Sequence, residues 1–166
     1  MTNPVNLESI QLELEQLVET VTPMLASLDP ESIAGRQDPK KWSKKEILGH
    51  LIDSAANNHQ KFVRLQSQTG FDFPGYAQEE WAAVQVWTDA DLESMTQLWR
   101  LYNRHLVYVI SKIPKAVQSN SMTIDGIGPF RLDFIVSDYV EHLKHHLRQI
   151  FPDAGFETSF KNVYHR

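Results

Sequence analysis

The spacing of the apolar residues constrains the fold most strongly, because apolar side chains recur every three or four positions in four separate segments. The first such series consists of Leu7, Ile10, Leu14, Leu17, Val21 and Leu25. This spacing places the side chains on one face of an α-helix. A chain of 166 residues is long enough for one domain with a substantial core and leaves little room for a second. We therefore expect one domain, over residues 1–166, in which four helices face a shared core.

Capping and breaking residues place the ends of these helices. Ser43, followed three positions later by Glu46, forms a capping box that begins the second helix. Pro30 and Pro114 follow the first and third apolar series, and proline disrupts a helix interior. The predicted helices lie near residues 5–28, 43–69, 89–112 and 131–151.

The remaining segments carry turn signals rather than helical periodicity. Residues 71–88 contain Pro74, Gly75 and several aromatic residues, which indicates a long connection that packs over the bundle. The stretch IDGIGPF has the chemistry of a short hairpin turn, and the tail after Pro152 has no assigned structure. No regular alternation of strands and helices is visible. The predicted fold class is all-α, an antiparallel four-helix bundle.

Composition and charge exclude several functional classes. The formal net charge is −5 and the one lysine-rich run, Lys40 to Lys45, is short, so we expect no nucleic-acid partner. The N-terminal MTNPVNLESIQ lacks the basic and apolar regions of a signal peptide, and no stretch reaches the length of a membrane span. We expect a cytoplasmic protein without a membrane partner. The chain has no cysteine, so any thiol chemistry must use an incoming thiol.

The segment EHLKHHLRQI, residues 141–150, holds three of the seven histidines. At about 100° per residue, His142 and His146 lie on one flank of the buried helix face, one turn apart. His145 lies roughly 100° further round and is predicted to point outwards on the polar side. Two imidazoles one turn apart can bind one divalent cation, but a useful site needs a third protein ligand.

The second predicted helix offers that third ligand. His50 lies at the edge of its apolar stripe, and Ser54 and Asn58 follow it towards the core. Facing helices lie about 8–10 Å apart, so imidazoles from both sides can meet at one ion. The alternative is that each histidine is only hydrogen-bonded at the edge of the core. Spacing by itself leaves both interpretations open.

Longer motifs resemble a known family. The segments KWSKKEILGHLIDSAANNHQKFVRLQ, FPGYAQEEW, LWRLYNRHL and DYVEHLKHHLRQI resemble the DinB-like superfamily and, within it, the YfiT-like metalloenzymes, over residues 36–151. The most specific parts are W-S-x-x-E-x-x-x-H-L-x-D around His50 and H-x-x-x-H-x-x-Q-I, which ends at Ile150. The resemblance implies a four-helix bundle that binds a divalent metal through His50, His142 and His146. It also implies a homodimer.

A site of three neutral histidines leaves the charge of the ion uncancelled and leaves coordination positions open. Such an ion can lower the pKa of water to about 7, which predicts a metal-dependent hydrolase of a small-molecule substrate. It can equally hold an external low-molecular-weight thiol as thiolate, which predicts a thiol-dependent S-transferase, and the family resemblance adds an isomerase to this alternative. A third alternative is a non-catalytic binding or stress-response module that the metal only stabilises. Zinc or nickel suits three imidazoles, with iron, copper or manganese as alternatives.

Four further residues are candidates for orienting a ligand or facing the substrate: Asp53, Asn57, Asn58 and Gln149. The alternative for Asp53 is an exposed helix position, and the alternative for Gln149 is a solvated one. Tyr76 and Trp81 either line the mouth of the site or cap the core. No general base is evident. A ferritin-like di-iron site is disfavoured, because it needs paired Glu-x-x-His motifs and the fourth helix offers only an outward Glu141.

Overall fold

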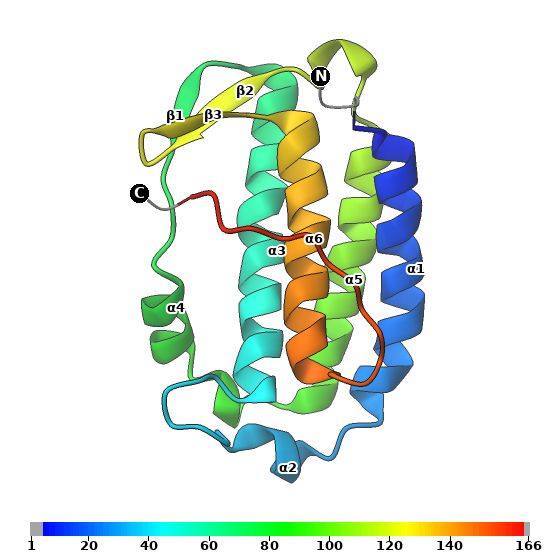
Figure 1. Ribbon diagram of the computed structural model, residues 1–166, viewed down its shortest axis with the longest axis vertical. Coiled ribbons are helices and arrows are strands. Elements are labelled where there is room, and N and C mark those ends of the chain that lie inside the picture. The colour runs from blue at the N-terminus through cyan, green and yellow to red at the C-terminus, as the bar shows by residue number, and fades with distance from the viewer. Residues whose placement is uncertain (1–4, 165–166) are drawn as a thin grey trace.

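Four long helices lie side by side in the computed structural model, which describes residues 5–164 (Figure 1). They are α1 (Leu7–Ala26), α3 (Lys44–Ser67), α5 (Leu92–Ser111) and α6 (Leu132–Ile150). Their ends lie within three residues of the predicted ends. The ends of the predicted domain, residues 1–4 and 165–166, lie outside the described residues.

Side-chain caps explain where three of these helices begin. Asn6 accepts hydrogen bonds from the backbone N–H groups of Glu8 and Ser9 at the start of α1. At the start of α3, Ser43 Oγ accepts from the Glu46 N–H, while the Glu46 carboxylate accepts from the Ser43 N–H. The predicted capping box is therefore confirmed. At the start of α5, the Asp91 carboxylate accepts a hydrogen bond from the Ser94 N–H.

The helices form a ring in which α1 and α3 each pack against both α5 and α6. Figure 1 shows α1 and α6 running downwards and α3 and α5 running upwards. The neighbours α1/α5 and α3/α6 are therefore antiparallel, whereas α3/α5 and α1/α6 are parallel. The predicted antiparallel arrangement holds for only half of the neighbouring pairs. The reason is the connection over residues 68–91, which returns outside the bundle from the top of α3 to the bottom of α5.

A small three-stranded sheet lies at the top of the bundle, so the prediction of a purely all-α fold needs correction. It contains β1 (Phe71–Phe73), β2 (Ser121–Ile124) and β3 (Ile127–Arg131) in that order. Strands β2 and β3 form the predicted hairpin, with positive φ at Asp125 (49°) and Gly126 (74°) as a type I′ turn requires. Strand β1 pairs in parallel with β2. Three residues are too few for an alternating pattern to predict β1.

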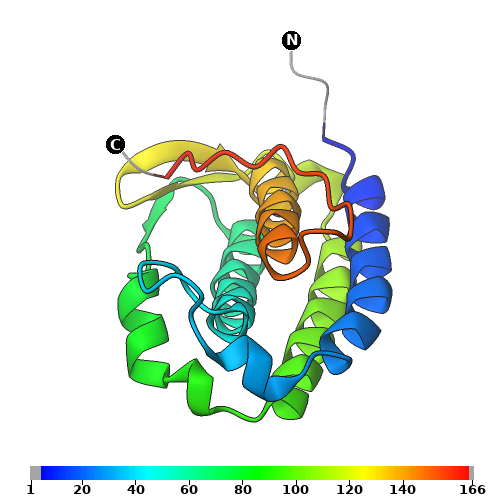
Figure 2. The same ribbon diagram turned by 60° about the horizontal axis from the view of Figure 1, so that its bottom comes forward.

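The connection before α5 contains α4 (Gln78–Gln85) and the 3-10 turn η1 (Trp87–Asp89), and Figure 2 shows α4 outside the long helices. The carboxylate of Asp53 on α3 accepts hydrogen bonds from Gln85 Nε2 at 2.9 and 3.0 Å. It also accepts one from Trp87 Nε1 at 3.3 Å. The Trp87 ring packs so closely on α3 that a Cβ added to Gly49 would lie 2.2 Å from its Cγ. The connection is thus anchored on both sides of His50.

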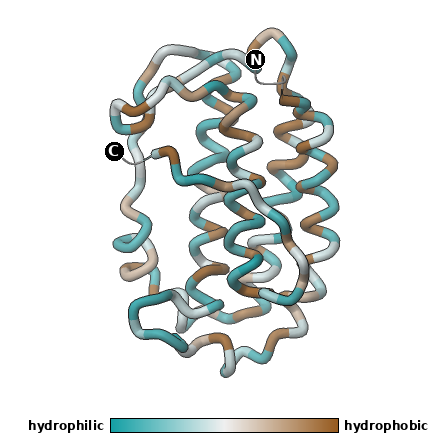
Figure 3. The backbone as a smooth tube through the Cα atoms, viewed as in Figure 1, coloured by the Kyte–Doolittle hydropathy of each residue, from teal (hydrophilic) through white to brown (hydrophobic). Residues whose placement is uncertain are grey.

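Apolar and polar residues alternate along each long helix, and the apolar faces form one core (Figure 3). Its largest fully buried side chains include Trp99, Phe62, Leu51 and Leu143. A second short helix, α2 (Pro30–Ala34), and a 3-10 turn, η2 (Lys115–Val117), connect the bundle at its ends. No helix within residues 5–164 combines the length and apolar character needed to cross a membrane.

Replacing Gly49 with Ala should destabilise the protein, because the new methyl group would collide with the Trp87 ring. Overpacking of this kind costs about 1–3 kcal/mol in the free energy of unfolding. Urea denaturation measures that free energy. Gly35→Ala is the matched control, because no atom lies within 4 Å of a Cβ at that position. Its effect should stay under about 0.5 kcal/mol. Equal stability of both variants would show that Trp87 moves away from α3 without cost.

Candidate metal centre

The antiparallel packing of α3 against α6 brings His50 opposite His142 and His146. The Nε2 atom of His142 lies 3.2 Å from Nε2 of His50 and 3.1 Å from Nε2 of His146. One ligand atom of each ring lies within 4.8 Å of those of the other two. Metal–nitrogen bonds of about 2.0–2.1 Å in a tetrahedron separate two ligand nitrogens by about 3.3 Å. The observed separations are close to that value, so the three rings fit one ion.

Each of the three rings has an oxygen atom near its other nitrogen, Nδ1. The Tyr76 hydroxyl lies 3.3 Å from Nδ1 of His50, and Ser54 Oγ lies 3.5 Å from Nδ1 of His142. Gln149 Oε1 accepts a hydrogen bond of 2.8 Å from Nδ1 of His146. Contacts of this kind fix the tautomer and leave the lone pair on Nε2, which then faces the cluster. The predicted role of Gln149 as an orienting residue is consistent with this contact.

Burial keeps the three imidazoles neutral. Burial and, to a smaller extent, the neighbouring His146 lower the pKa of His50 to about 3. Burial also lowers the pKa of His146 to about 4 and holds the pKa of His142 well below its usual range. A neutral imidazole is the form that ligates a metal. The rings are therefore in a ligating protonation state at neutral pH.

Histidine is the only residue type in this cluster. Among residues 5–164, the side chains of His, Cys, Asp and Glu close enough to hold an ion as a group of three or more are these three histidines. No carboxylate joins them there, so a divalent ion would keep its charge and have positions that the protein leaves free. This donor set can support Lewis-acid chemistry. It differs from the carboxylate-rich set of ferritin-like bundles.

His145 lies outside the cluster, but the prediction that it points outwards is only partly correct. It is half-buried, with its ring centroid 5.4 Å from that of Phe160 and 5.0 Å from that of His146. The helical angle placed it correctly on the other flank of α6. The C-terminal tail, residues 151–164, covers that flank, and this cover could not be predicted from helix periodicity.

The structure places the three polar candidates of α3 in different roles. Asp53 is buried and not an exposed helix residue, and it holds Gln85 and Trp87 as described above. The Asn57 side chain donates a hydrogen bond to the backbone carbonyl of Asp53. None of these hydrogen bonds of Asp53 and Asn57 involves a histidine. Asn58 donates to Ser54 Oγ at 3.3 Å and to the Ser54 carbonyl at 2.9 Å. Asn58 therefore supports the residue that faces His142.

Aromatic residues surround the cluster, and sequence reasoning missed some of them. The ring of Trp42 lies 5.0 Å from that of His50, and the ring of Phe160 lies 5.1 Å from that of His142. Tyr76 contacts Trp81, whose side chain is exposed, with ring centroids 5.1 Å apart. This favours the prediction that Tyr76 and Trp81 line the site. The unexplained aromatic residues of the polar tail were the available signal for Phe160.

Glu141 attaches the tail to α6 instead of pointing into solvent. Its Oε2 accepts hydrogen bonds from Ser159 N at 2.6 Å and from Thr158 Oγ1 at 3.1 Å. In Figure 1 the tail runs across α6. The tail therefore brings Phe160 to the rings of His142 and His145.

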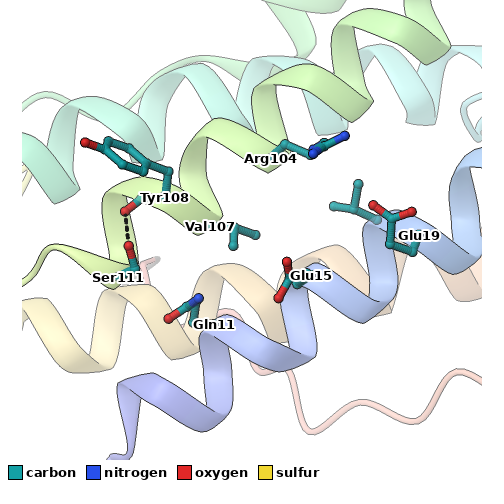
Figure 4. A pocket seen from close by; sticks show the side chains of 8 residues that line it. Gln11, Glu15, Glu19, Arg104, Val107, Tyr108 and Ser111 are labelled. Carbon is teal, nitrogen blue, oxygen red and sulfur yellow. Dashed lines mark hydrogen bonds between the residues drawn. The ribbon is translucent and has the colours of Figure 1, made fainter.

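A separate hollow of about 290 Å³ lies between α1 and α5, and Figure 4 shows it from close by. Glu15, Glu19, Arg104 and Tyr108 are among its lining residues. None of the three clustered histidines lines it. This hollow is therefore not part of the histidine site.

Comparisons with known proteins agree with this architecture. The sequence profile of the DinB superfamily matches residues 13–150. The chain is 24% identical over 144 residues to the "Putative metal-dependent hydrolase" of Oceanobacillus iheyensis, a match that covers 87% of this chain and 80% of that protein. YfiT from Bacillus subtilis, described as a probable metal-dependent hydrolase with an unusual four-helix bundle topology, has a similar structure with a TM-score of 0.79. That match covers 91% of this chain and 89% of YfiT at 14% identity, so it bears on the fold alone.

Replacing His146 with Ala should remove most of the metal affinity, because two imidazoles hold an ion much less firmly than three. Replacing His145 with Ala should leave the metal content nearly unchanged, because His145 lies outside the cluster. Metal per chain, measured by mass spectrometry after dialysis against a dilute metal salt, compares the two variants. Equal loss from both would mean that His145 takes part in binding.

Replacing Tyr76 with Phe removes only the hydroxyl beside His50 Nδ1. We expect the metal affinity to fall by roughly 10–100-fold, the usual effect of removing a group that orients a ligand. Competition with a chromogenic chelator measures this affinity. Tyr102→Phe is the matched control, because the Tyr102 hydroxyl contacts His59 and not the cluster. An unchanged affinity in Tyr76→Phe would show that the hydroxyl does not orient His50.

Proposed function

The chain belongs to the DinB superfamily, and on this premise we propose that it is a metal-dependent hydrolase whose divalent ion is held by His50, His142 and His146. One observation carries the proposal: Nε2 of His142 lies 3.2 Å from that of His50 and 3.1 Å from that of His146, close to the separation of two ligand atoms on a single ion. The names of the relatives from Oceanobacillus iheyensis and Bacillus subtilis support it.

In this proposal the residues around the histidines prepare the site for chemistry. A bound divalent ion supplies Lewis acidity for the activation of water. Tyr76, Ser54 and Gln149 hold the three rings in place through their Nδ1 atoms. Trp42 and Phe160 cover His50 and His142 and limit the water around them. Electrostatic interactions inside the site are strengthened by this partial exclusion of water.

The second candidate function is a thiol-dependent S-transferase or isomerase. One observation favours it: within the described residues no carboxylate belongs to the cluster. The cluster therefore lacks the carboxylate that usually serves as the general acid or base of a hydrolytic site. An external thiol depends less on a general base, because a cation stabilises its thiolate directly. The chain has no cysteine that could replace the external thiol.

The remaining expectations stay proposals. Zinc or nickel is proposed as the ion, because imidazole nitrogen suits both. The substrate is proposed to be a small molecule. A homodimer and a cytoplasmic location remain predictions from the sequence.

The test is an activity screen of the metal-stripped protein after reloading with zinc, nickel or manganese. Small esters and amides serve as substrates, each with and without an added low-molecular-weight thiol. We expect hydrolysis that needs the metal and does not need the thiol. His142→Ala should lower it by at least about 100-fold, the upper end of what is lost when an orienting group is removed. His105→Ala should not lower it, because His105 belongs to α5 and lies outside the cluster.

Each other outcome selects an alternative. Products that form only with the thiol would replace the hydrolase by the transferase. Absence of turnover in both series, together with a large fall in melting temperature on chelation, would identify a module that the metal only stabilises.

A further inference from the structure

Polar side chains continue from the three histidines along the interface between α3 and α6. On α3 these side chains are spaced four, three and four positions apart, and on α6 they are spaced four positions apart. The side chains of each helix therefore occupy one face of that helix. We call this set the polar seam; it consists of His50, Ser54, Asn57, Lys61, Asp138, His142 and His146. Because α3 and α6 are antiparallel, Lys61 and Asp138 lie together at the far end of the seam from His146.

Lys61 is the unusual member of the polar seam. It is half-buried, and its Nζ lies 5.7 Å from the ring centroids of both Phe73 and Tyr164. No ion pair between described residues includes Lys61. The nearby Asp138 carboxylate accepts a hydrogen bond of 2.6 Å from the Tyr164 hydroxyl instead. Burial lowers the pKa of Lys61 to about 8, and the charge of Asp138 opposes this shift.

The aromatic contacts only partly compensate for this charge. An ammonium group that is partly withdrawn from water normally has an anionic or hydrogen-bonding partner, because its desolvation is otherwise unfavourable. Within residues 5–164, Nζ of Lys61 forms no ion pair, and the nearby Asp138 carboxylate attracts its charge without pairing with it. Phe73 and Tyr164 fix the position of the cation without neutralising it. This arrangement is suited to an anion that comes from outside the chain.

Lys61 and the histidine cluster lie along the same interface between α3 and α6. Asp138 lies one helical turn before His142, about 6 Å along the axis of α6 at 1.5 Å per residue. Lys61 lies two turns beyond Ser54, about 10 Å along the axis of α3. A small molecule of about this length would be needed to touch both the histidines and Lys61.

We propose that Lys61 binds an anionic group, carboxylate or phosphate, of a substrate whose reacting group lies at the three histidines. The inference rests on the proposed function and adds the substrate class: a small anion whose charged group lies roughly 6–10 Å from its reacting group. Lys61 recognises the charge, and the aromatic residues Phe73 and Tyr164 keep its ammonium group in place. The same chemistry accommodates a carboxylic acid and a phosphate ester, which the ligands of the test distinguish.

The test uses the cobalt-loaded protein, whose visible spectrum reports an anion that enters the metal site. Acetate is compared with succinate, glutarate, adipate and suberate, which place a second carboxylate at increasing distance, and with phosphate esters of similar length. At least one of the longer anions should bind roughly tenfold more tightly than acetate, the effect of one additional charge-assisted hydrogen bond. The most tightly bound series identifies the preferred anionic group.

Lys61→Met removes the charge and keeps an apolar stem between the two rings. In this variant the longer anions should bind no more tightly than acetate, and acetate binding should be unchanged. Lys112→Gln is the matched control: its Nζ lies 5.4 Å from the Tyr108 ring on α5, outside the polar seam, and its loss should leave all affinities unchanged. Equal binding of the longer anions to Lys61→Met and to the wild type would overturn the proposal.

Two further measurements separate this proposal from the proposed function and from a purely structural role. Calorimetric titration of the metal-free protein with inorganic phosphate should show binding that Lys61→Met loses. If cobalt failed to bind but phosphate binding were retained, the proposed metal-dependent function would be overturned and the role of Lys61 in anion binding would stand. Thermal unfolding of Lys61→Met should occur at the wild-type temperature or above, because removing a half-buried charge that forms no ion pair relieves its desolvation. A strongly destabilised variant with intact phosphate binding would assign Lys61 to packing.

Discussion

The packing of α3 against α6 is the contact on which the rest of the structure depends. Apolar residues of both helices, such as Leu51 and Phe62 on α3 and Leu143 on α6, hold the two helices together within the core. The Phe62 and Tyr139 rings meet at right angles with centroids 5.8 Å apart. This packing brings His50 to His142, which follows it 92 positions later in the chain. Burial at the same interface keeps the imidazoles neutral, so a single contact determines both the geometry and the protonation state of the site.

Two segments outside the bundle complete the surroundings of that interface. The connection with α4 and η1 is held by Asp53 and supplies Tyr76. The tail is held by Glu141 and supplies Phe160. Neither segment contributes a histidine of the cluster. Both instead control how much water reaches it, and in a less hydrated site charge–charge and charge–dipole interactions are stronger.

The polar seam has a cost in stability that the apolar core offsets. Three imidazoles lie together with Nε2 separations of 3.1 and 3.2 Å from His142, and Lys61 forms no ion pair within residues 5–164. Sites that bind ligands commonly sacrifice stability in this way. Fully buried residues such as Trp99, Leu106 and Leu147 belong to the apolar core that offsets this cost. The fold therefore maintains an interior line of polar groups that packing alone would not select.

The sequence by itself determined the local features of the protein. Period-three-and-four spacing gave the bounds of α1, α3, α5 and α6, and the phase of α6 separated His142 and His146 from His145. Turn residues gave the β2–β3 hairpin. These features follow from interactions between residues a few positions apart, which a sequence displays directly.

Only the tertiary structure decided how these parts meet. The parallel pairs α3/α5 and α1/α6, the strand β1, and the tail over His145 depend on segments far apart in the chain. The burial of Asp53 and the position of Lys61 between Phe73 and Tyr164 depend on the same distant contacts. The physical reason is that periodicity gives the direction of a side chain on its own helix, whereas its environment is set by the neighbour that packs against that face.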